Sequence, residues 1–252
     1  MKSNKNVHLF VTCVADRLGA HAGESTVNLL RQFGCIVKFT DQQSCCGQPA
    51  YNAGHHDAAA SVAKYWLNLY DALVSSDNDY IVVPSGSCGA MIHHYSSLFP
   101  VDSPEYIKAQ RLSPHVRELT QFLVDDLGVT ATGIDLKGKR VAYHDSCHAM
   151  RNMNVYAQPR LLLENAGAEL VAWDESCCGF GGLFSVKLPQ ISTAMLDRKL
   201  SSIKSQSNVD YLTSTDLGCL LQLSGGLTRQ NVTTPVLHIA ELLDSSHKVH
   251  AL

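Results

Sequence analysis

Two short stretches, Cys45-Cys46-Gly47-Gln48-Pro49 and Cys177-Cys178-Gly179, give the strongest indication of the fold of this 252-residue chain. The two adjacent cysteine pairs lie 132 residues apart. One further cysteine precedes and one follows each pair, at offsets of 134 and 131 residues: Cys13 and Cys88 around the first pair, Cys147 and Cys219 around the second. Because the register drifts by only three positions across each half, the pattern predicts an internal duplication.

Other residues follow the same register. Arg17 and Arg151 each lie four residues after the first cysteine of their half, and a glycine follows each adjacent pair. Of the nine cysteines, Cys35 has no counterpart, and its apolar neighbours indicate a buried, inert thiol. An odd number of cysteines with two adjacent pairs argues against a disulfide framework. Clustered thiols in a reducing compartment indicate metal or redox chemistry.

Length and composition are those of a globular protein. The net charge of −3 gives no electrostatic basis for binding nucleic acid, and no stretch approaches the ~18 apolar residues of a membrane span. The apolar residues 7–11 follow two lysines and so resemble the start of a secretory signal. However, His8 and Thr12 interrupt this run, and its β-branched residues favour a buried strand. We therefore expect a cytoplasmic protein.

Hydrophobic periodicity predicts strands that alternate with helices in both halves. In the first half we expect strands at residues 7–13, 36–40 and 80–84 and helices at 22–33 and 58–73. In the second half we expect strands at 140–143, 169–173 and 210–213 and helices near 159–166 and 189–202. The pattern predicts an α/β fold with two pseudo-symmetric, Rossmann-like βαβ halves and parallel sheets. These halves would be residues 1–128 and 139–252, with a linker near 129–138.

The cysteines fall at, or just after, the carboxyl ends of the expected strands. That edge is where open α/β sheets bind their ligands. We therefore expect eight cysteines to serve as metal ligands, four in each half: Cys13, Cys45, Cys46 and Cys88, then Cys147, Cys177, Cys178 and Cys219.

The nature of the metal follows from the ligand type and spacing. Four thiolates suffice for a tetrahedral zinc ion or a [4Fe–4S] cube. Structural zinc usually takes two short C-x₂₋₄-C pairs, whereas here the ligands come singly or as adjacent pairs about 30 to 40 residues apart, which favours a cluster. Gly47 and Gly179 would let the backbone pass close to a cluster sulfide. Arg17 and Arg151 could donate hydrogen bonds to cluster sulfurs, or simply form surface ion pairs.

Two histidines flank the first cysteine of the second half. His144 and His148 lie close enough to Cys147 to ligate a metal or to hydrogen-bond a cluster sulfur. Because the first half has no equivalent histidines, a supporting role or plain packing is the competing interpretation. The G-x-G-x-x-G fingerprint is absent, so no dinucleotide site is expected.

The arrangements C-x₃₁-C-C-G-x₄₀-C and C-x₂₉-C-C-G-x₃₉-C resemble the cysteine-rich CCG domain, present twice over nearly the whole chain. Such domains occur in the heterodisulfide reductase B subunit, in iron–sulfur subunits of glycolate and glycerol-3-phosphate oxidases, and in lactate utilization proteins. A ferredoxin-type cysteine run is absent. The bare tandem, with Cys45-Cys46-Gly47-Gln48-Pro49 and His144-Asp145-Ser146-Cys147-His148, is most similar to the lactate utilization protein A family.

This resemblance implies an iron–sulfur protein with one or two clusters per chain, [4Fe–4S] being the simplest type. It implies an electron-transfer subunit, inactive alone, of an oxidoreductase complex that oxidises L-lactate to pyruvate. Its partners would be the other subunits and a quinone-linked acceptor, through which it could lie at the inner face of the membrane. The alternatives are a cluster-based disulfide or thiol reductase, a subunit of a glycolate or glycerol-3-phosphate oxidase, and a zinc-stabilised structural protein.

The chain departs from the family pattern at one position in each half. Many CCG domains end in C-x₂-C, which supplies a fifth cysteine, but Ser85 and Asp216 stand at these positions here. A five-thiolate, non-cubane cluster is therefore in doubt. Either Ser85 or Asp216 could instead donate an oxygen to iron, and the missing thiols weaken a disulfide-reducing role.

Overall fold

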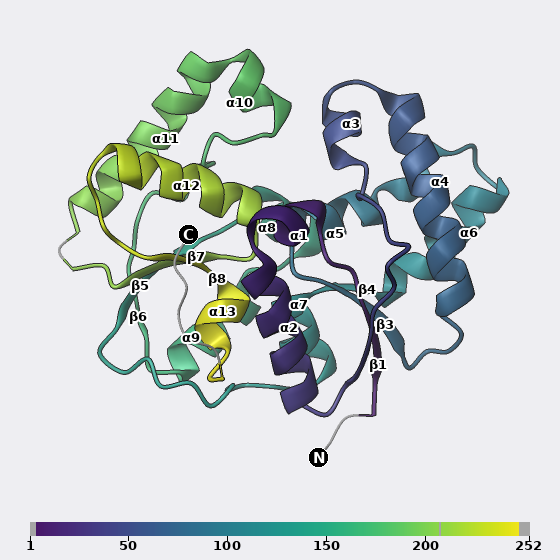
Figure 1. The fold of residues 1–252 in the computed structure, drawn as a ribbon, viewed down its shortest axis with the longest axis horizontal. Coiled ribbons are helices and arrows are strands. Elements are labelled where there is room, and N and C mark those ends of the chain that lie inside the picture. The colour runs from purple at the N-terminus through teal and green to yellow at the C-terminus, as the bar shows by residue number, and fades with distance from the viewer. Residues whose placement is uncertain (1–3, 207, 247–252) are drawn as a thin grey trace.

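The computed structural model describes residues 4–206 and 208–246, which form two four-stranded sheets (Figure 1). All strand pairs are parallel. The first sheet has the order β2-β1-β3-β4: β1 (Asn6–Leu9), β2 (Ile36–Lys38), β3 (Asp79–Val83) and β4 (Val116–Glu118). The second has the order β6-β5-β7-β8: β5 (Arg140–His144), β6 (Glu169–Leu170), β7 (Tyr211–Ser214) and β8 (Val236–His238). The expected α/β fold with two repeated, parallel halves is confirmed.

The helices also repeat in order. The first half contains α1 (Cys13–Leu18), α2 (Ala20–Gln32), α3 (Gln48–Asn52), α4 (His56–Leu73), α5 (Gly86–His93), α6 (Pro104–Leu112) and α7 (Leu119–Gln121). The second contains α8 (Cys147–Met153), α9 (Ala157–Asn165), α10 (Leu183–Lys187), α11 (Pro189–Lys204), α12 (Leu217–Arg229) and α13 (Ile239–Leu243). Short 3₁₀ segments lie at Tyr95–Leu98 and Ser113–His115, and a π turn at Phe122–Asp126. Within the described ranges, no helix is long and apolar enough to cross a membrane.

The first strand is shorter than expected, for a local reason. The expected strand at residues 7–13 ends at Leu9 because Thr12 caps helix α1, its Oγ1 accepting a hydrogen bond from the Ala15 N–H at 3.3 Å. Cys13 is therefore the first residue of a helix and not the last of a strand. The expected strand at residues 169–173 was also too long, since β6 pairs only over Glu169–Leu170.

Strands β4 and β8 were missed in the sequence. Each is three residues long and runs directly into a helix, so its period-2 signal is too short to recognise. The last residue of each strand caps that helix. Glu118 accepts hydrogen bonds from two backbone N–H groups of α7, and His238 accepts one from the Ala240 N–H of α13. The two halves therefore match beyond their cysteines.

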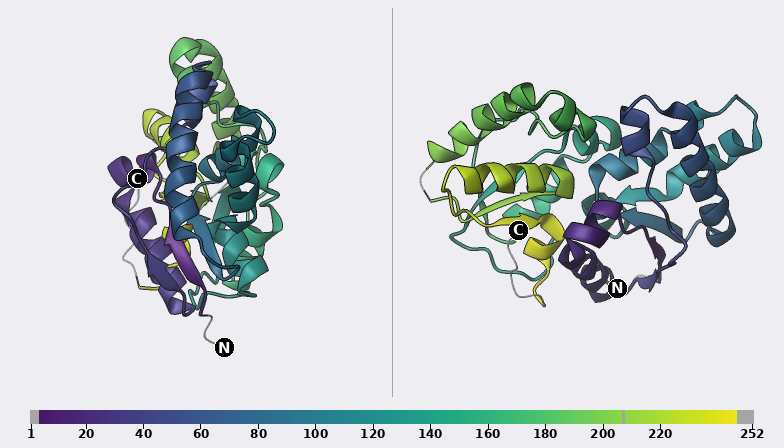
Figure 2. Two further views of the ribbon diagram at one scale, coloured as in Figure 1. Left: turned by 90° about the vertical axis from the view of Figure 1, so that its right-hand side faces the viewer. Right: turned by 45° about the horizontal axis from the view of Figure 1, so that its top comes forward.

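The two sheets share an apolar core. One buried cluster combines Val7 and Val82 of the first sheet with Val141 and Leu237 of the second, and helices α2 and α13 pack together beside it (Figure 1). Each half also has a buried cluster under its outer helices. In the first half it lies around α4 and α5, and in the second around α11 and α12. The shared core explains why the halves lie side by side in the right-hand view of Figure 2.

The halves approach most closely where α5 meets α8. A Cβ atom added at Gly86 would lie 2.3 Å from the Cβ of Ala149, so only glycine fits at this crossing. Helices α1, α5 and α8 and one end of α12 gather here, at the carboxyl edge of both sheets (Figure 1). The contact thus brings the ligand edges of the two sheets together.

Candidate metal centres

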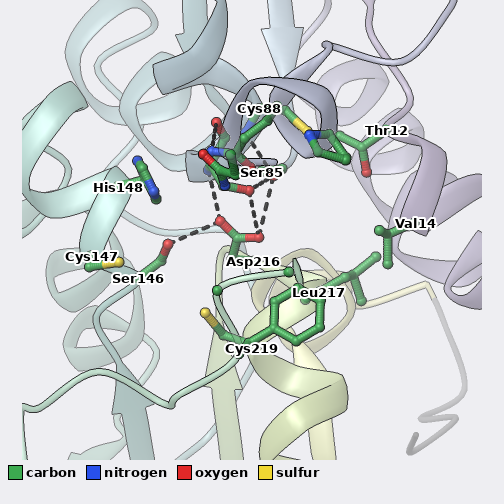
Figure 3. Close-up of a pocket in the computed structure, with 18 of the residues that line it drawn as sticks. Thr12, Val14, Ser85, Cys88, Ser146, Cys147, His148, Asp216, Leu217 and Cys219 are labelled. Atoms are coloured by element: carbon green, nitrogen blue, oxygen red, sulfur yellow. Dashed lines mark hydrogen bonds between the residues drawn. The ribbon is translucent and has the colours of Figure 1, made fainter. Parts of the chain in front are cut away.

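Both cysteine sets open onto one cleft between the halves. Its volume is ≈ 200 Å³, and Figure 3 shows side chains that line it, which come from helices and loops of both halves. Seven of the eight predicted ligands line it: Cys13, Cys46, Cys88, Cys147, Cys177, Cys178 and Cys219. The eighth, Cys45, is outside this lining, and its Sγ lies 3.8 Å from that of Cys13. The duplication therefore places two ligand sets face to face.

Four of the cysteines lie in the first turns of helices. Cys13 and Cys147 are the first residues of α1 and α8, and Cys88 and Cys219 are the third residues of α5 and α12. The unpaired N–H groups and the dipole of a helix N-terminus stabilise negative charge. Thiolates, or an anionic cluster that they hold, are therefore favoured at these positions.

In the first set, the sulfurs contact one another in two pairs. Cys13 and Cys45 form one pair, and Cys46 and Cys88 form the other at 3.4 Å. Hydrogen bonds from Cys13, from Cys46 and from the Gly47 N–H, which lies 3.4 Å from the sulfur, hold the pKa of Cys45 well below its usual value. These contacts therefore favour the thiolate form at Cys45 more than at the other cysteines of this set.

The second set repeats this geometry. The Gly179 N–H lies 3.4 Å from the Sγ of Cys177, and a hydrogen bond from Cys147 holds the pKa of Cys177 well below its usual value. Both glycines that follow the pairs have a φ of +83°, in the left-handed region that favours glycine. Here the left-handed turn directs the N–H back onto the preceding thiolate.

Among the sequence-predicted histidines, His144 lies within the second set. Its ring and the sulfurs of Cys178 and Cys219 have donor atoms that all lie within 4.8 Å of one another. Burial, and then the charge of Lys199, lower the pKa of His144 to about 3, so the ring is neutral, and its Nδ1 has no hydrogen-bond partner. A neutral imidazole with a free nitrogen can ligate a metal or donate to a cluster sulfur. His148 lines the cleft.

The spread of the sulfurs distinguishes between a single ion and a cluster. Zinc bonded to four thiolates at about 2.3 Å would hold every pair of sulfurs about 3.8 Å apart. Among the described residues, His144, Cys178 and Cys219 form the one group of three possible ligands whose donor atoms all lie within 4.8 Å of one another. No three sulfurs of the first set are therefore that close. All eight are free thiols. By this spacing, the first set fits a cluster better than a single zinc ion, whereas His144, Cys178 and Cys219 of the second set are close enough for either.

Different side chains surround the two sets. Phe10 precedes Cys13 by three residues, as His144 precedes Cys147. The Phe10 ring packs edge-on against Trp66 and Tyr70, whereas the His144 ring packs against Trp173. A cluster of three aromatic rings therefore lies beside the first set, where a histidine and a tryptophan lie beside the second.

The positions of the missing fifth cysteines carry a hydrogen-bond network between the halves (Figure 3). Asp216 is buried and accepts hydrogen bonds from the Ser87 N–H at 2.7 Å, the Ser87 hydroxyl at 3.0 Å and the Ser146 hydroxyl at 3.0 Å. Ser85 donates to the same carboxylate at 3.5 Å and caps α5 by accepting from the Cys88 N–H. Burial raises the pKa of Asp216. The oxygens of Asp216 thus join α5 to α8, which is a role other than the iron ligation considered above.

The two arginines lie outside the cleft lining. The Arg17 side chain is 83% exposed and pairs with Asp16 at 3.4 Å, and Arg151 is exposed in the last turn of α8. A contact of either arginine with a cluster stays a prediction. Cys35 is buried in the shared core, where burial raises its pKa to about 11, as expected of an inert thiol.

Lys199 was overlooked in the sequence. It is fully buried in α11, beside the second cysteine set. The signal was present, because Lys199 lies three residues after Leu196 and four before Ile203, on the apolar face of the helix. A lysine on such a face, between helical turns of buried residues, is a candidate for a role beyond solubility.

Comparisons with known proteins agree with this geometry. The profile of the cysteine-rich CCG domain matches residues 7–93 and 141–224. The chain is 42% identical to lactate utilization protein A of Bacillus cytotoxicus, over 95% of this chain and 98% of that protein. It is 44% identical to lactate utilization protein A of Geobacillus kaustophilus, with the same coverage. A hypothetical protein from Helicobacter pylori shares the fold, with a TM-score of 0.67 at 14% identity over 99% of this chain and 52% of that structure.

Proposed function

Because the chain belongs to the lactate utilization protein A family and consists of two cysteine-rich CCG domains, we propose that it transfers electrons within a complex that oxidises L-lactate to pyruvate. The supporting observation is the convergence of two four-cysteine sets on one cleft, each with a hydrogen-bonded thiolate. A [4Fe–4S] cluster bound by such a set would take up and release one electron at a time.

The residues of this chain would hold and tune such clusters. Cys13, Cys45, Cys46 and Cys88 would hold one, and Cys147, Cys177, Cys178 and Cys219 the other, with Gly47 and Gly179 donating N–H groups to sulfur. The shared core and the Asp216 network would fix the two sets relative to each other, so that little structural rearrangement accompanies the movement of an electron.

The remaining features of the proposal follow from the family. The other subunits of the complex would bind and oxidise lactate, and a quinone-linked acceptor would receive the electrons. The chain would act in the cytoplasm, at most peripheral to the inner face of the membrane through its partners, and would not oxidise lactate alone. Its two domains would be residues 1–128 and 139–252, of which residues 1–3, 207 and 247–252 lie outside the described ranges.

Metal analysis tests the cofactor. We expect anaerobically purified protein to contain iron and acid-labile sulfide in equal amounts, whereas zinc without either would refute the proposal. Growth tests the role. A strain that lacks this protein should lose growth on L-lactate and regain it with the wild-type chain but not with a Cys45→Ser chain. Full growth with the variant would contradict electron transfer through the first site.

One observation favours a second candidate, a cluster-based reductase of a small disulfide. Both cysteine sets face the same cleft of ≈ 200 Å³, which could admit a substrate between them. This candidate predicts turnover of a disulfide by the isolated chain with a chemical reductant. If iron-containing protein reduces no disulfide, the reductase is excluded and electron transfer is the remaining candidate.

A further inference from the structure

The loops that carry the two cysteine pairs are each held by the helix that follows, but by different groups. In the first half, the Tyr65 hydroxyl of α4 donates to the carbonyl of Gln42 at 2.7 Å, and this side chain is 48% exposed. In the second half, Lys199 of α11 donates to the carbonyl of Asp174, which is equivalent to Gln42 at the 132-residue offset. A neutral, exposed phenol therefore holds the first loop at the carbonyl where a buried amine holds the second.

The surroundings of Lys199 match a charged amine. Its Nζ donates to the carbonyls of Asp174 and Ser176, the latter at 2.9 Å, and lies 3.9 Å from the centre of the Trp173 ring. All three partners accept and none donates, so they match the three N–H groups of an ammonium. Burial lowers the pKa of Lys199, while the charge of Asp174 and the nearby sulfurs of Cys178 and Cys219 raise it.

Neighbouring charges do not cancel this one. The Asp174 carboxylate pairs with Arg198 at 3.3 Å, and Asp145 pairs with Arg160 at 2.6 Å. Asp216 lies between the two halves, where it accepts hydrogen bonds from serines of both. Lys199 is therefore the buried positive charge by which the second site differs from the first.

We propose that Lys199 makes the second site the more easily reduced of the two, so that an electron entering the chain comes to rest in the second half. The inference rests on the proposed iron–sulfur function. Reduction adds one electron, supplied by the lactate-oxidising partner or by dithionite, and changes one iron from ferric to ferrous. A buried ammonium stabilises the added negative charge more strongly than exposed groups do, because the interior screens charge poorly. Lys199 acts through this field and through the loop that it holds, and is a positioning residue.

The test is a dithionite titration of the full-length, anaerobically purified protein, followed by low-temperature EPR after its iron content has been measured. We expect two reduction steps at different potentials. Cys177→Ser should remove the step at the higher potential, and Cys45→Ser the step at the lower potential. Coincident steps, or the reverse assignment, would overturn the inference even if every Lys199 variant failed to fold.

A matched pair of variants tests the residue itself. Lys199→Met, which keeps the volume and removes the charge, should weaken reduction of the second site at least tenfold, about 59 mV for one electron, and leave the first site unchanged. Tyr65→Phe should shift neither step. A Lys199→Met protein with both steps unchanged, or with both shifted equally, contradicts the inference. Protein without iron refutes the proposed function first, and this inference with it, so the two failures are distinguishable.

Discussion

The two halves of this protein share their ligands and differ in what surrounds them. Cysteines, left-handed glycines and helix N-termini match position by position. Phe10 in the first half stands where His144 stands in the second, and Tyr65 and Lys199 each donate to the equivalent carbonyl of their half. The two halves thus share the candidate metal ligands and differ in the residues packed around them. Matched changes in the two halves can therefore separate what is common from what is specific.

The largest difference is expected at the paired glycines. In Gly179→Ala, the new Cβ would lie 2.6 Å from the backbone oxygen of Ser192, whereas in Gly47→Ala the nearest atom, the oxygen of Ala59, lies at 3.4 Å. Both variants carry the cost of a left-handed alanine, about 1–2 kcal/mol, and the first adds the cost of overpacking. We expect losses of about 4 and about 2 kcal/mol, measured by denaturant unfolding monitored by circular dichroism. Equal losses would contradict the packing difference.

The residues that end β4 and β8 should give opposite pH dependences. Burial raises the pKa of Glu118 to about 7, so this residue stabilises the fold at low pH, and that stability is lost as the pH rises from about 4.5 through 7. Glu118→Gln should remove this loss. The free energy of unfolding of the variant minus that of the wild type should therefore rise by about 3 kcal/mol between pH 4.5 and pH 8. Burial lowers the pKa of His238 to about 4, so its contribution is lost as the pH falls from 6.5 through 4.

Denaturant unfolding of each variant and of the wild type, at matched pH values, measures these terms. His238→Asn, which keeps a capping side chain, is the control for the second half. A Glu118→Gln protein whose pH profile runs parallel to that of the wild type would show that Glu118 is ionised in the fold.

Substitutions at the equivalent positions Ser85 and Asp216 should cost different amounts of stability. Asp216→Ala leaves the Ser87 N–H and the Ser146 hydroxyl without a buried acceptor, and we expect a loss of about 2–3 kcal/mol. Ser85→Ala removes one helix cap, for about 1 kcal/mol. Asp216→Asn, which retains one acceptor oxygen, is the control and should lie between the two. An Asp216→Ala protein with the same free energy of unfolding as the wild type would show that this network does not hold α5 and α8 together.

The paired arginines should show the smallest effect. Because Arg17 and Arg151 are exposed and outside the cleft lining, alanine at either position should change stability by less than about 0.5 kcal/mol. Iron content and reduction potentials should also remain as in the wild type. A loss of iron in either variant would instead support the predicted contact with a cluster.

The features that the duplication repeats could be predicted from the sequence. The cysteine register indicated two halves, and buried apolar runs between helices predicted parallel sheets, as observed. Strands β4 and β8 escaped because three residues cannot show a period. Thr12 ended the first strand early because its capping hydrogen bond outweighed the β-propensity of the apolar run.

What the sequence could not predict is how the halves are joined. The shared core, the Gly86 crossing and the Asp216 network depend on residues that are far apart in the chain. Asp216 could be recognised as a departure from the family pattern, but its partners are Ser87 of α5 and Ser146, the N-cap of α8, which lie in different halves of the chain. No local pattern reports such a contact.

The central claim is that each half holds its own iron–sulfur cluster. The most direct measurement is the iron and acid-labile sulfide content of the anaerobically purified wild type, Cys45→Ser and Cys177→Ser, each folded by circular dichroism. The account predicts that each variant retains about half of the wild-type iron and sulfide, because eight thiolates form two independent sets. Complete loss in either variant, or unchanged iron in both, would contradict two separate sites.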